Sequence, residues 1–179
     1  TQGTILAWIN VGLDKDKNTI FSHGDTAGPA NYHFFAIDTN GKLEITDNNS
    51  SSGPASMLFR QTTGTVLASA GWQLVGLSMG SDNIWHLWVD GLEVDASIVA
   101  GYNGSNGRWF NDGTNHDAIA VGVLKRNTLA HYFNGQIAQV GVWGGSSGAT
   151  GVLTAAQISA IYDLGPGADL TTSYATGMT

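Results

Sequence analysis

A loop rich in Asn, Asp and Gly carries the side chains best suited to recognise a sugar. Residues 103–117, NGSNGRWFNDGTNHD, combine an adjacent aromatic pair with an arginine and several amide and carboxylate oxygens. An aromatic ring stacks on the C–H face of a sugar, while Asn, Asp and Arg share hydrogen bonds with its hydroxyls. We therefore predict a shallow glycan site with five contacts: Arg108, Trp109, Asn111, Asp112 and Asn115. The alternative is a turn-rich connection that Trp109 and Phe110 anchor to the rest of the protein.

The same loop also offers oxygen ligands for a metal ion. Carboxylate and amide oxygens are the ligands that calcium prefers, and backbone carbonyls of the loop add to them. The spacing is not that of an EF-hand loop. Calcium is the candidate cofactor, held by three residues: Asp112, Asn115 and Asp117.

A second candidate site lies on a predicted strand over residues 84–90, IWHLWVD. Because side chains alternate between the two faces of a strand, His86 and Trp88 share one face, opposite Trp85 and Leu87. If the face of Trp88 is open to solvent, these two side chains form a platform for a sugar. The alternative is that Trp88 packs in the protein interior, and the pattern alone leaves both possibilities open.

The acidic and histidine residues form no recognisable catalytic pattern. A glycosidase needs two carboxylates across a cleft, about 5 to 10 Å apart. The nearest pair, Glu44 and Asp47, would point to opposite faces of a strand. The five histidines lie at no metal-ligand spacing, so each is interpreted as structural or exposed. We predict that the chain is not an enzyme; the alternative, a polysaccharide-active enzyme, requires acids or histidines from distant strands to meet in a cleft.

Composition excludes two classes of partner. The 179 residues carry a net charge of −7 with only seven Lys and Arg, which leaves no basic stripe to bind nucleic acid. No run reaches the roughly 18 apolar residues that span a bilayer, so we expect no membrane insertion. The chain has no cysteine, and so neither a disulfide nor a thiolate zinc site.

Short alternating segments separated by Gly, Asn and Asp turns predict an all-β fold. The Asn40-Gly41 and Asp90-Gly91 pairs tolerate the positive φ that tight hairpin turns need. The expected strands cover these residue ranges: 4–11, 19–22, 32–38, 42–46, 58–61, 65–67, 71–79, 84–90, 92–95, 118–124 and 136–143. Turn residues roughly every ten positions favour a two-sheet antiparallel sandwich.

One helix is expected, over residues 155–164. Thr154 and Gln157 form a capping box at its start, and Gly165 followed by Pro166 ends it. The apolar stripe predicted to be buried consists of Ile158, Ile161 and Tyr162.

Several of these segments together resemble the laminin-G-like jelly-roll domains of the concanavalin-A-like lectin and glucanase superfamily. The residues that carry the resemblance are the opening strand 4–11, Gly71-Trp72, the WVDG of 88–91, the FNGQI of 133–137, the VGVW of 140–143 and the LTAAQI of 153–158. The resemblance implies a two-sheet antiparallel β-sandwich, with functional sites on one concave face or in rim loops. Members of the family bind glycans or proteins, sometimes through calcium. We place this domain at residues 1–165 and a C-terminal extension or linker at 166–179, whose segment 167–177 is similar to the segment after such domains in bacteriophage virion proteins.

These observations predict a non-catalytic surface recognition module, glycan-binding or adhesive, of a virion or an extracellular protein. Its expected partner is a glycan or a surface protein, and its expected location is outside the cell or on the virion surface. The alternative is a structural or decoration protein of a bacteriophage particle, whose low charge and Gly-rich surface serve contacts with other virion subunits. A recognition module leaves an aromatic-lined concavity open, whereas an assembly protein buries its loops against neighbouring subunits.

Overall fold

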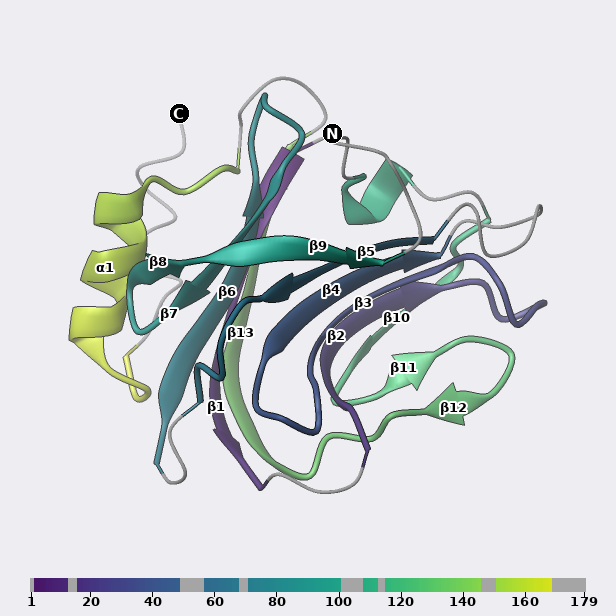
Figure 1. Cartoon of the computed structure of the whole chain (residues 1–179), viewed down its shortest axis with the longest axis horizontal. Helices are drawn as coiled ribbons and strands as arrows, with labels where there is room; N and C mark the ends of the chain where they lie inside the picture. Colours follow the sequence, from purple (N-terminus) through teal and green to yellow (C-terminus); the bar gives the residue numbers. More distant parts are fainter. Residues whose placement is uncertain are drawn as a thin grey trace.

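Two antiparallel sheets pack face to face in this protein (Figure 1). The computed structural model describes residues 2–12, 16–48, 57–67, 71–100, 108–112, 115–145 and 151–168. The five-stranded sheet contains, in spatial order, β13 (Gly135–Gly145), β1 (Gln2–Val11), β6 (Gln73–Met79), β7 (Trp85–Val89) and β8 (Leu92–Val94). The six-stranded sheet contains β10 (Ala118–Val121), β2 (Asn18–Gly24), β3 (Tyr32–Ile37), β4 (Leu43–Asn48), β5 (Met57–Thr62) and β9 (Ala96–Ala100).

Three smaller elements accompany the sheets. A hairpin joins β11 (Leu124–Lys125) to β12 (Leu129–Ala130), a short 3₁₀ helix covers Phe110–Asp112, and α1 covers Ala155–Leu164. The predicted all-β sandwich with one short C-terminal helix is therefore confirmed. No helix in the described part of the chain is long and apolar enough to cross a membrane.

The main core lies between the two sheets, because alternate side chains of each strand point inward. On β1 these are Ile5, Ala7 and Ile9, each at most 1% exposed. The intervening residues of β1 are buried as well, since Leu6 and Trp8 lie under α1 in a second apolar cluster. The strand is therefore covered on both of its faces.

Helix α1 begins and ends as its sequence predicts. The Thr154 hydroxyl accepts a hydrogen bond from the backbone N–H of Gln157, whose side chain bonds back to the backbone of Thr154, and Gly165 ends the helix with a φ of 77°. Ile158 and Ile161 are fully buried against the five-stranded sheet. The prediction for Tyr162 is wrong in part: its side chain is 38% exposed, because only one face of its ring stacks on Trp8.

Two predicted strands differ from the structure, and one observed strand was not predicted. Gly122, with a φ of 78°, ends β10 early, so the strand expected over 118–124 divides between β10 and the β11–β12 hairpin. Residues 65–67 form no strand, since the N–H groups of Val66 and Leu67 bond to the carbonyl of Gly41. Strand β9 was not predicted, and it pairs with the distant β5. Of the predicted extension 166–179, the structure describes residues 166–168.

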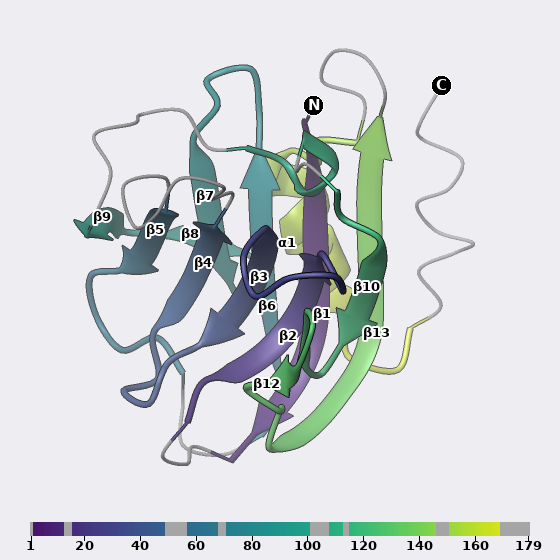
Figure 2. The ribbon, with the colours of Figure 1, turned by 90° about the vertical axis from the view of Figure 1, so that its right-hand side faces the viewer.

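The outer faces of the two sheets are covered differently. Helix α1 packs on the outer face of the five-stranded sheet. On the outer face of the six-stranded sheet the described elements contribute only the β11–β12 hairpin, whose Leu124 packs on Phe34 and Ala36 of β3. Figure 2 looks onto this second face, where β5, β4, β3 and β2 lie side by side with α1 behind them. No described helix or strand covers the outer side of β4 and β5.

Candidate functional site

The loop predicted to stack on a sugar is anchored in the core instead. Trp109 is 4% exposed and Phe110 is 6% exposed, and both belong to the main core. A Cβ atom on Gly3 would come within 2.5 Å of the Trp109 indole, so β1 approaches that ring closely. This burial contradicts the prediction that Trp109 stacks on a ligand. It confirms the alternative, a connection that the two aromatic rings hold in place.

The polar residues of the loop bond within the protein. The Nε of Arg108 donates to Oδ2 of Asp47 at 2.7 Å, and Asp47 is 1% exposed. Asp112, in the 3₁₀ helix with Asn111, accepts from the backbone N–H of Trp109 at 3.0 Å. Asn115 is exposed with a φ of 60°. The predicted glycan contacts Arg108 and Asp112 are thus engaged in holding the loop.

The predicted calcium ligands are engaged in a similar way. Both oxygens of Asp117 accept hydrogen bonds from Thr26, at 2.8 Å from its N–H and 2.6 Å from its hydroxyl. Within the described ranges, no three His, Cys, Asp or Glu residues come together to hold a metal ion. Calcium at Asp112, Asn115 and Asp117 stays a prediction, because asparagine and backbone oxygens can also ligate it.

A cluster of three histidines lies behind this loop, and no sequence spacing pointed to it. The ring of His116 lies 4.6 Å from that of His23 and 5.1 Å from that of His33, between ring centroids. Nε2 of His33 lies 2.5 Å from Oδ1 of Asp47. Burial, followed by the neighbouring His33 and His23, lowers the pKa of His116 to about 4. His116 is therefore neutral at pH 7.

Strand β4 separates its two acids as the alternation predicts. Asp47 points inward to His33 and Arg108, whereas Glu44 points outward to Lys17. The expectation that Glu44 and Asp47 lie on opposite faces is confirmed, and the two cannot act together on one substrate.

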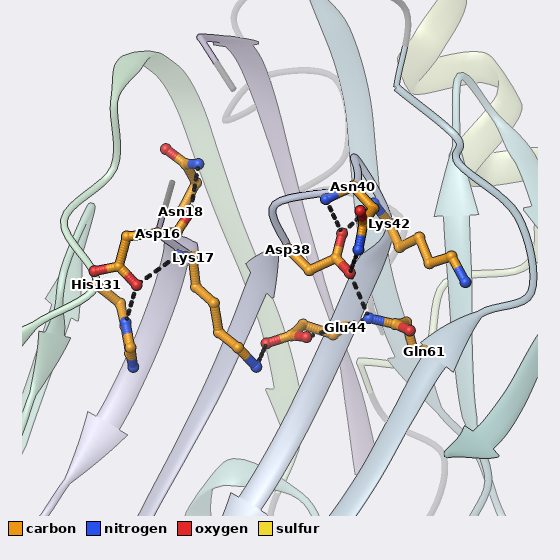
Figure 3. A network of polar contacts seen from close by, with 9 residues as sticks. All are labelled: Asp16, Lys17, Asn18, Asp38, Asn40, Lys42, Glu44, Gln61 and His131. Carbon is orange, nitrogen blue, oxygen red and sulfur yellow. Dashed lines mark hydrogen bonds and ion pairs between the residues drawn. The ribbon is translucent and has the colours of Figure 1, made fainter. Parts of the chain in front are cut away.

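The outer side of β4 and β5 carries a polar network that sequence patterns did not reveal (Figure 3). The ammonium of Lys17 lies 2.5 Å from Oε1 of Glu44, which is 1% exposed. The amide nitrogen of Gln61, on β5, donates to Asp38 at 3.0 Å and to Glu44 at 3.4 Å. Burial raises the pKa of Glu44, and the Lys17 ammonium partly offsets that rise.

The β3–β4 turn fixes one end of this network. The carboxylate of Asp38 accepts from the backbone N–H of Asn40 at 2.8 Å and from that of Lys42 at 2.9 Å. Asp38 is therefore a turn-stabilising carboxylate that also orients Gln61. The Lys42 side chain points away from Glu44 (Figure 3).

Aromatic rings border the same network. The ammonium of Lys17 lies 5.5 Å from the ring centroid of Phe34 and 5.2 Å from that of Phe59, within the range of cation–π attraction. Phe34 is 3% exposed, whereas Phe59 and Tyr32 are only half-buried. We call Lys17, Glu44, Gln61, Phe59 and Tyr32 the sheet-face site. Lys17 is 34% exposed, whereas Glu44 and Gln61 are 1% and 8% exposed, so the Lys17 ammonium and the Phe59 and Tyr32 rings are the parts of the site that reach solvent.

Trp88 is largely buried, so the predicted platform of His86 and Trp88 is not a broad open face, and a sugar contact there stays a prediction. The side chain is 7% exposed and packs under α1 with Trp8 and Leu74, while its indole N–H donates to the Ser78 hydroxyl at 2.8 Å. Most of the Trp88 ring therefore packs in the interior, and only an edge of it reaches the open pocket beside His86. His86, on the same strand face, lies at the edge of this packed region and lines an open pocket.

Comparison with known proteins assigns the fold to a family. The family model described as the concanavalin A-like lectin/glucanases superfamily matches residues 1–159. The chain belongs to this superfamily. The resemblance predicted from sequence motifs is therefore confirmed. No curated protein sequence matches this superfamily member.

Solved structures show the same architecture at low sequence identity. The CBM40 of the Ruminococcus gnavus IT-sialidase, bound to alpha2,3 sialyllactose, is 17% identical with a TM-score of 0.71, over 90% of this chain and 82% of that one. The NanB sialidase from Streptococcus pneumoniae is 15% identical with a TM-score of 0.62, over 89% of this chain and 24% of that one. A SAP-like pentraxin from Limulus polyphemus is 16% identical with a TM-score of 0.54, over 90% of this chain and 69% of that one. At these identities the likeness establishes the fold of this superfamily member and nothing further.

Proposed function

We propose that this chain is a non-catalytic carbohydrate-binding module whose glycan lies on the sheet-face site. The observation that carries the proposal is the Lys17–Glu44–Gln61 network bordered by the half-buried Phe59 ring. A sugar needs an aromatic or apolar surface for its C–H face and fixed polar groups for its hydroxyls. The Ruminococcus CBM40 of the same fold is bound to a glycan, sialyllactose, which supports this ligand class.

The position of the site is inferred from the state of the other surfaces. The loop around Trp109 and Arg108 is engaged internally. The outer face of the five-stranded sheet is packed against α1 except for a pocket beside Ser78 and His86. No described helix or strand covers the outer side of β4 and β5, although the Glu44 and Gln61 side chains there are 1% and 8% exposed.

The charge of the site favours neutral glycans. The one ammonium of the network, that of Lys17, already pairs with the Glu44 carboxylate, and the whole chain carries a net charge of −7. The Arg126 guanidinium lies at the Tyr32 end of the site, 5.3 Å from the ring centroid. At the Lys17–Glu44–Gln61 end an acidic sugar would meet no uncompensated cation, so its association there would be slowed and weakened. We therefore expect neutral glycans to bind more tightly than sialylated ones.

The arrangement of acids supports a binding role over hydrolysis. Glu44 is 1% exposed and paired with Lys17, and Asp38 holds the β3–β4 turn through its hydrogen bonds to Asn40 and Lys42. A glycosidase would need both carboxylates free to act on one bond, as acid and as base or nucleophile. The proposal includes an extracellular or virion-surface setting, where glycans are accessible.

A glycan array probed with the purified chain, with and without calcium, tests the proposal. We expect saturable binding to neutral glycans, weakened about tenfold in Phe59→Ala, because an aromatic contact contributes roughly 1 to 1.5 kcal/mol. Val142→Ala is the matched control, since Val142 is an exposed apolar residue of β13 in the other sheet. Absence of binding to every glycan, or equal losses in both variants, would contradict the proposed site.

A second candidate function, assembly through protein contacts in a virus particle, is favoured by a different observation. Ile119 and Val121 on β10 and Val142 on β13 are 66%, 49% and 53% exposed, and both strands are edges of their sheets. Exposed apolar edges of this kind suit contacts between subunits. Light scattering distinguishes the candidates, because an assembly protein should form ordered oligomers and a glycan-binding module should remain a monomer.

A further inference from the structure

An open pocket of about 310 Å³ lies on the outer face of the five-stranded sheet, on the other side of the sandwich from the sheet-face site. It forms where the start of α1 meets the outer face of β6 and β7, and Ser78, His86, Trp88 and Leu153 line it with Asp82 and Glu93. Its volume is at the lower end of the roughly 300 to 1,000 Å³ typical of small-ligand sites. A pocket of this size accommodates a single sugar ring.

One wall of the pocket is a histidine held between two carboxylates. Nδ1 of His86 lies 2.5 Å from Oε1 of Glu93, and its Nε2 lies 2.8 Å from Oδ2 of Asp82. Burial alone would lower the pKa of His86, but the hydrogen bonds to Glu93 and Asp82 outweigh it and raise that pKa. Both ring nitrogens can donate only in the imidazolium, so this geometry selects the protonated form.

The floor of the pocket is apolar and rigid. The indole of Trp88 is fixed by its hydrogen bond to Ser78 at 2.8 Å, and the backbone N–H of Leu153 donates to the Thr4 hydroxyl at 2.9 Å. Leu153 is 5% exposed. Floor and wall come from separate elements whose positions the core fixes, so the pocket is preformed.

The lining is rich in acceptors and carries excess negative charge. Two carboxylates face one imidazolium, and the remaining lining residues are uncharged. Asp82 and Glu93 are 44% and 51% exposed in their side chains, so a ligand can reach them from solvent. Such a pocket attracts a ligand that brings donors and a positive charge, and it repels an anion.

We propose that this pocket binds an amino sugar through its free ammonium group. The ammonium would lie against the Asp82 and Glu93 carboxylates, and a hydroxyl would bond to the exposed Ser81. The apolar edge of the ring would meet the exposed edges of Trp88 and Leu153. This ligand and this face both differ from those of the proposed glycan site, so the inference goes beyond the proposed function. The protein would then bind two kinds of sugar on opposite sides.

Matched monosaccharides test the charge requirement directly. Nuclear magnetic resonance of the full chain at pH 6, where the glucosamine amine is protonated, would follow the Trp88 indole N–H and the His86 ring during titration. We expect saturable shifts with glucosamine and at least fivefold weaker binding of N-acetylglucosamine, which has the same ring without the charge. Equal affinity for the two sugars, or no shift at either residue, would overturn the proposal. Lysine amide, which carries ammonium groups but no sugar ring, is a further control. If it bound as tightly as glucosamine, the proposal would also be overturned, because the sugar ring would then contribute nothing.

Two variants locate the binding within the molecule. Glu93→Gln should weaken glucosamine at least fivefold while retaining the melting temperature, since Glu93 is half-exposed on β8. Asp163→Asn, an exposed acid on α1 outside the pocket lining, is the matched control and should bind as wild type. Equal binding by wild type and Glu93→Gln would overturn the assignment.

The proposals for the pocket and for the sheet-face site can be refuted independently of each other. Phe59→Ala should leave glucosamine binding intact, and Glu93→Gln should leave array binding intact. Glucosamine binding without any array signal would support the pocket and refute the sheet-face site.

Discussion

Replacement of Lys17 by methionine removes the charge that compensates a buried carboxylate while keeping most of the side-chain volume. Glu44 is 1% exposed, and its remaining hydrogen-bond partner in the network is the Gln61 amide at 3.4 Å. Removal of one partner of a fully buried ion pair costs about 3 to 5 kcal/mol. Because the Lys17 side chain is 34% exposed and water screens it, we expect a smaller loss of about 2 kcal/mol. For a chain of this size, that loss lowers the melting temperature by about 4 to 8 °C.

The cost should depend on pH in a defined direction. Burial raises the pKa of Glu44 above its ordinary 4.5, so its ionised form is disfavoured in the folded protein. A carboxyl group whose pKa is raised in the folded protein destabilises the fold at pH values above that raised pKa. The destabilisation fades as pH falls from the raised pKa to the ordinary one. The loss in Lys17→Met should therefore be full at pH 7.5 and small at pH 4, where a neutral Glu44 needs no counter-charge.

Denaturant unfolding of four proteins at both pH values measures this effect. The double variant Lys17→Met/Glu44→Gln should recover most of the stability at pH 7.5, because the unpaired charge is gone. Lys42→Met is the matched control, since its side chain points away from Glu44 (Figure 3) and its loss should be small. An equal loss at pH 4 and pH 7.5, or an equal loss in Lys42→Met, would refute a charge-compensating role for Lys17.

Three further predictions concern the rest of the fold. Trp109→Ala should cost about 3 to 5 kcal/mol in denaturant unfolding and leave glycan affinity of the folded fraction unchanged, because the ring is in the core; selective loss of glycan binding would contradict its burial. The pKa of His116 is lowered to about 4 in the folded protein, so the folded state resists protonation of this side chain. The stability that wild type has above pH 6.5 should therefore fall as pH drops from 6.5 to 4. The melting temperature of His116→Gln should fall less over the same window. Thr154→Ala should lower stability by about 1 kcal/mol through loss of the cap on α1, and an unchanged unfolding midpoint would show that the cap is dispensable.

Local patterns were sufficient to predict most of the fold. Alternating apolar residues identified strands such as β1, and the capping box at Thr154 with the stop at Gly165 placed α1 correctly. The missed strand β9 shows the limit, because its place is fixed by pairing with β5 across the sequence rather than by its own pattern. The early end of β10 depends on the positive φ of Gly122.

The candidate sites were harder to predict, because their residues meet only in the folded chain. Lys17 and Glu44 are 27 positions apart, and Gln61 is 17 positions beyond Glu44, so no motif links them. The alternation of Leu43, Glu44 and Ile45 could have placed the Glu44 carboxylate on the outer face. Its burial and its pairing with Lys17 could not have been inferred.

The two tryptophans of the sequence predictions illustrate the same limit. Trp109 in a polar loop and Trp88 on a strand are compatible with a ligand platform as readily as with a core position. The neighbours decide between the two, and these are Gly3 for Trp109 and α1 for Trp88. Both neighbours are remote in sequence.

The most direct test of the proposed function is to map, by nuclear magnetic resonance, which residues respond to the neutral glycan that binds most tightly on the array. Binding on the outer face of the six-stranded sheet predicts saturable shifts at Lys17, Phe59 and Gln61, with the loop at residues 108–112 unchanged. Shifts confined to that loop, or no response to any glycan at millimolar concentration, would contradict a carbohydrate-binding face on β4 and β5.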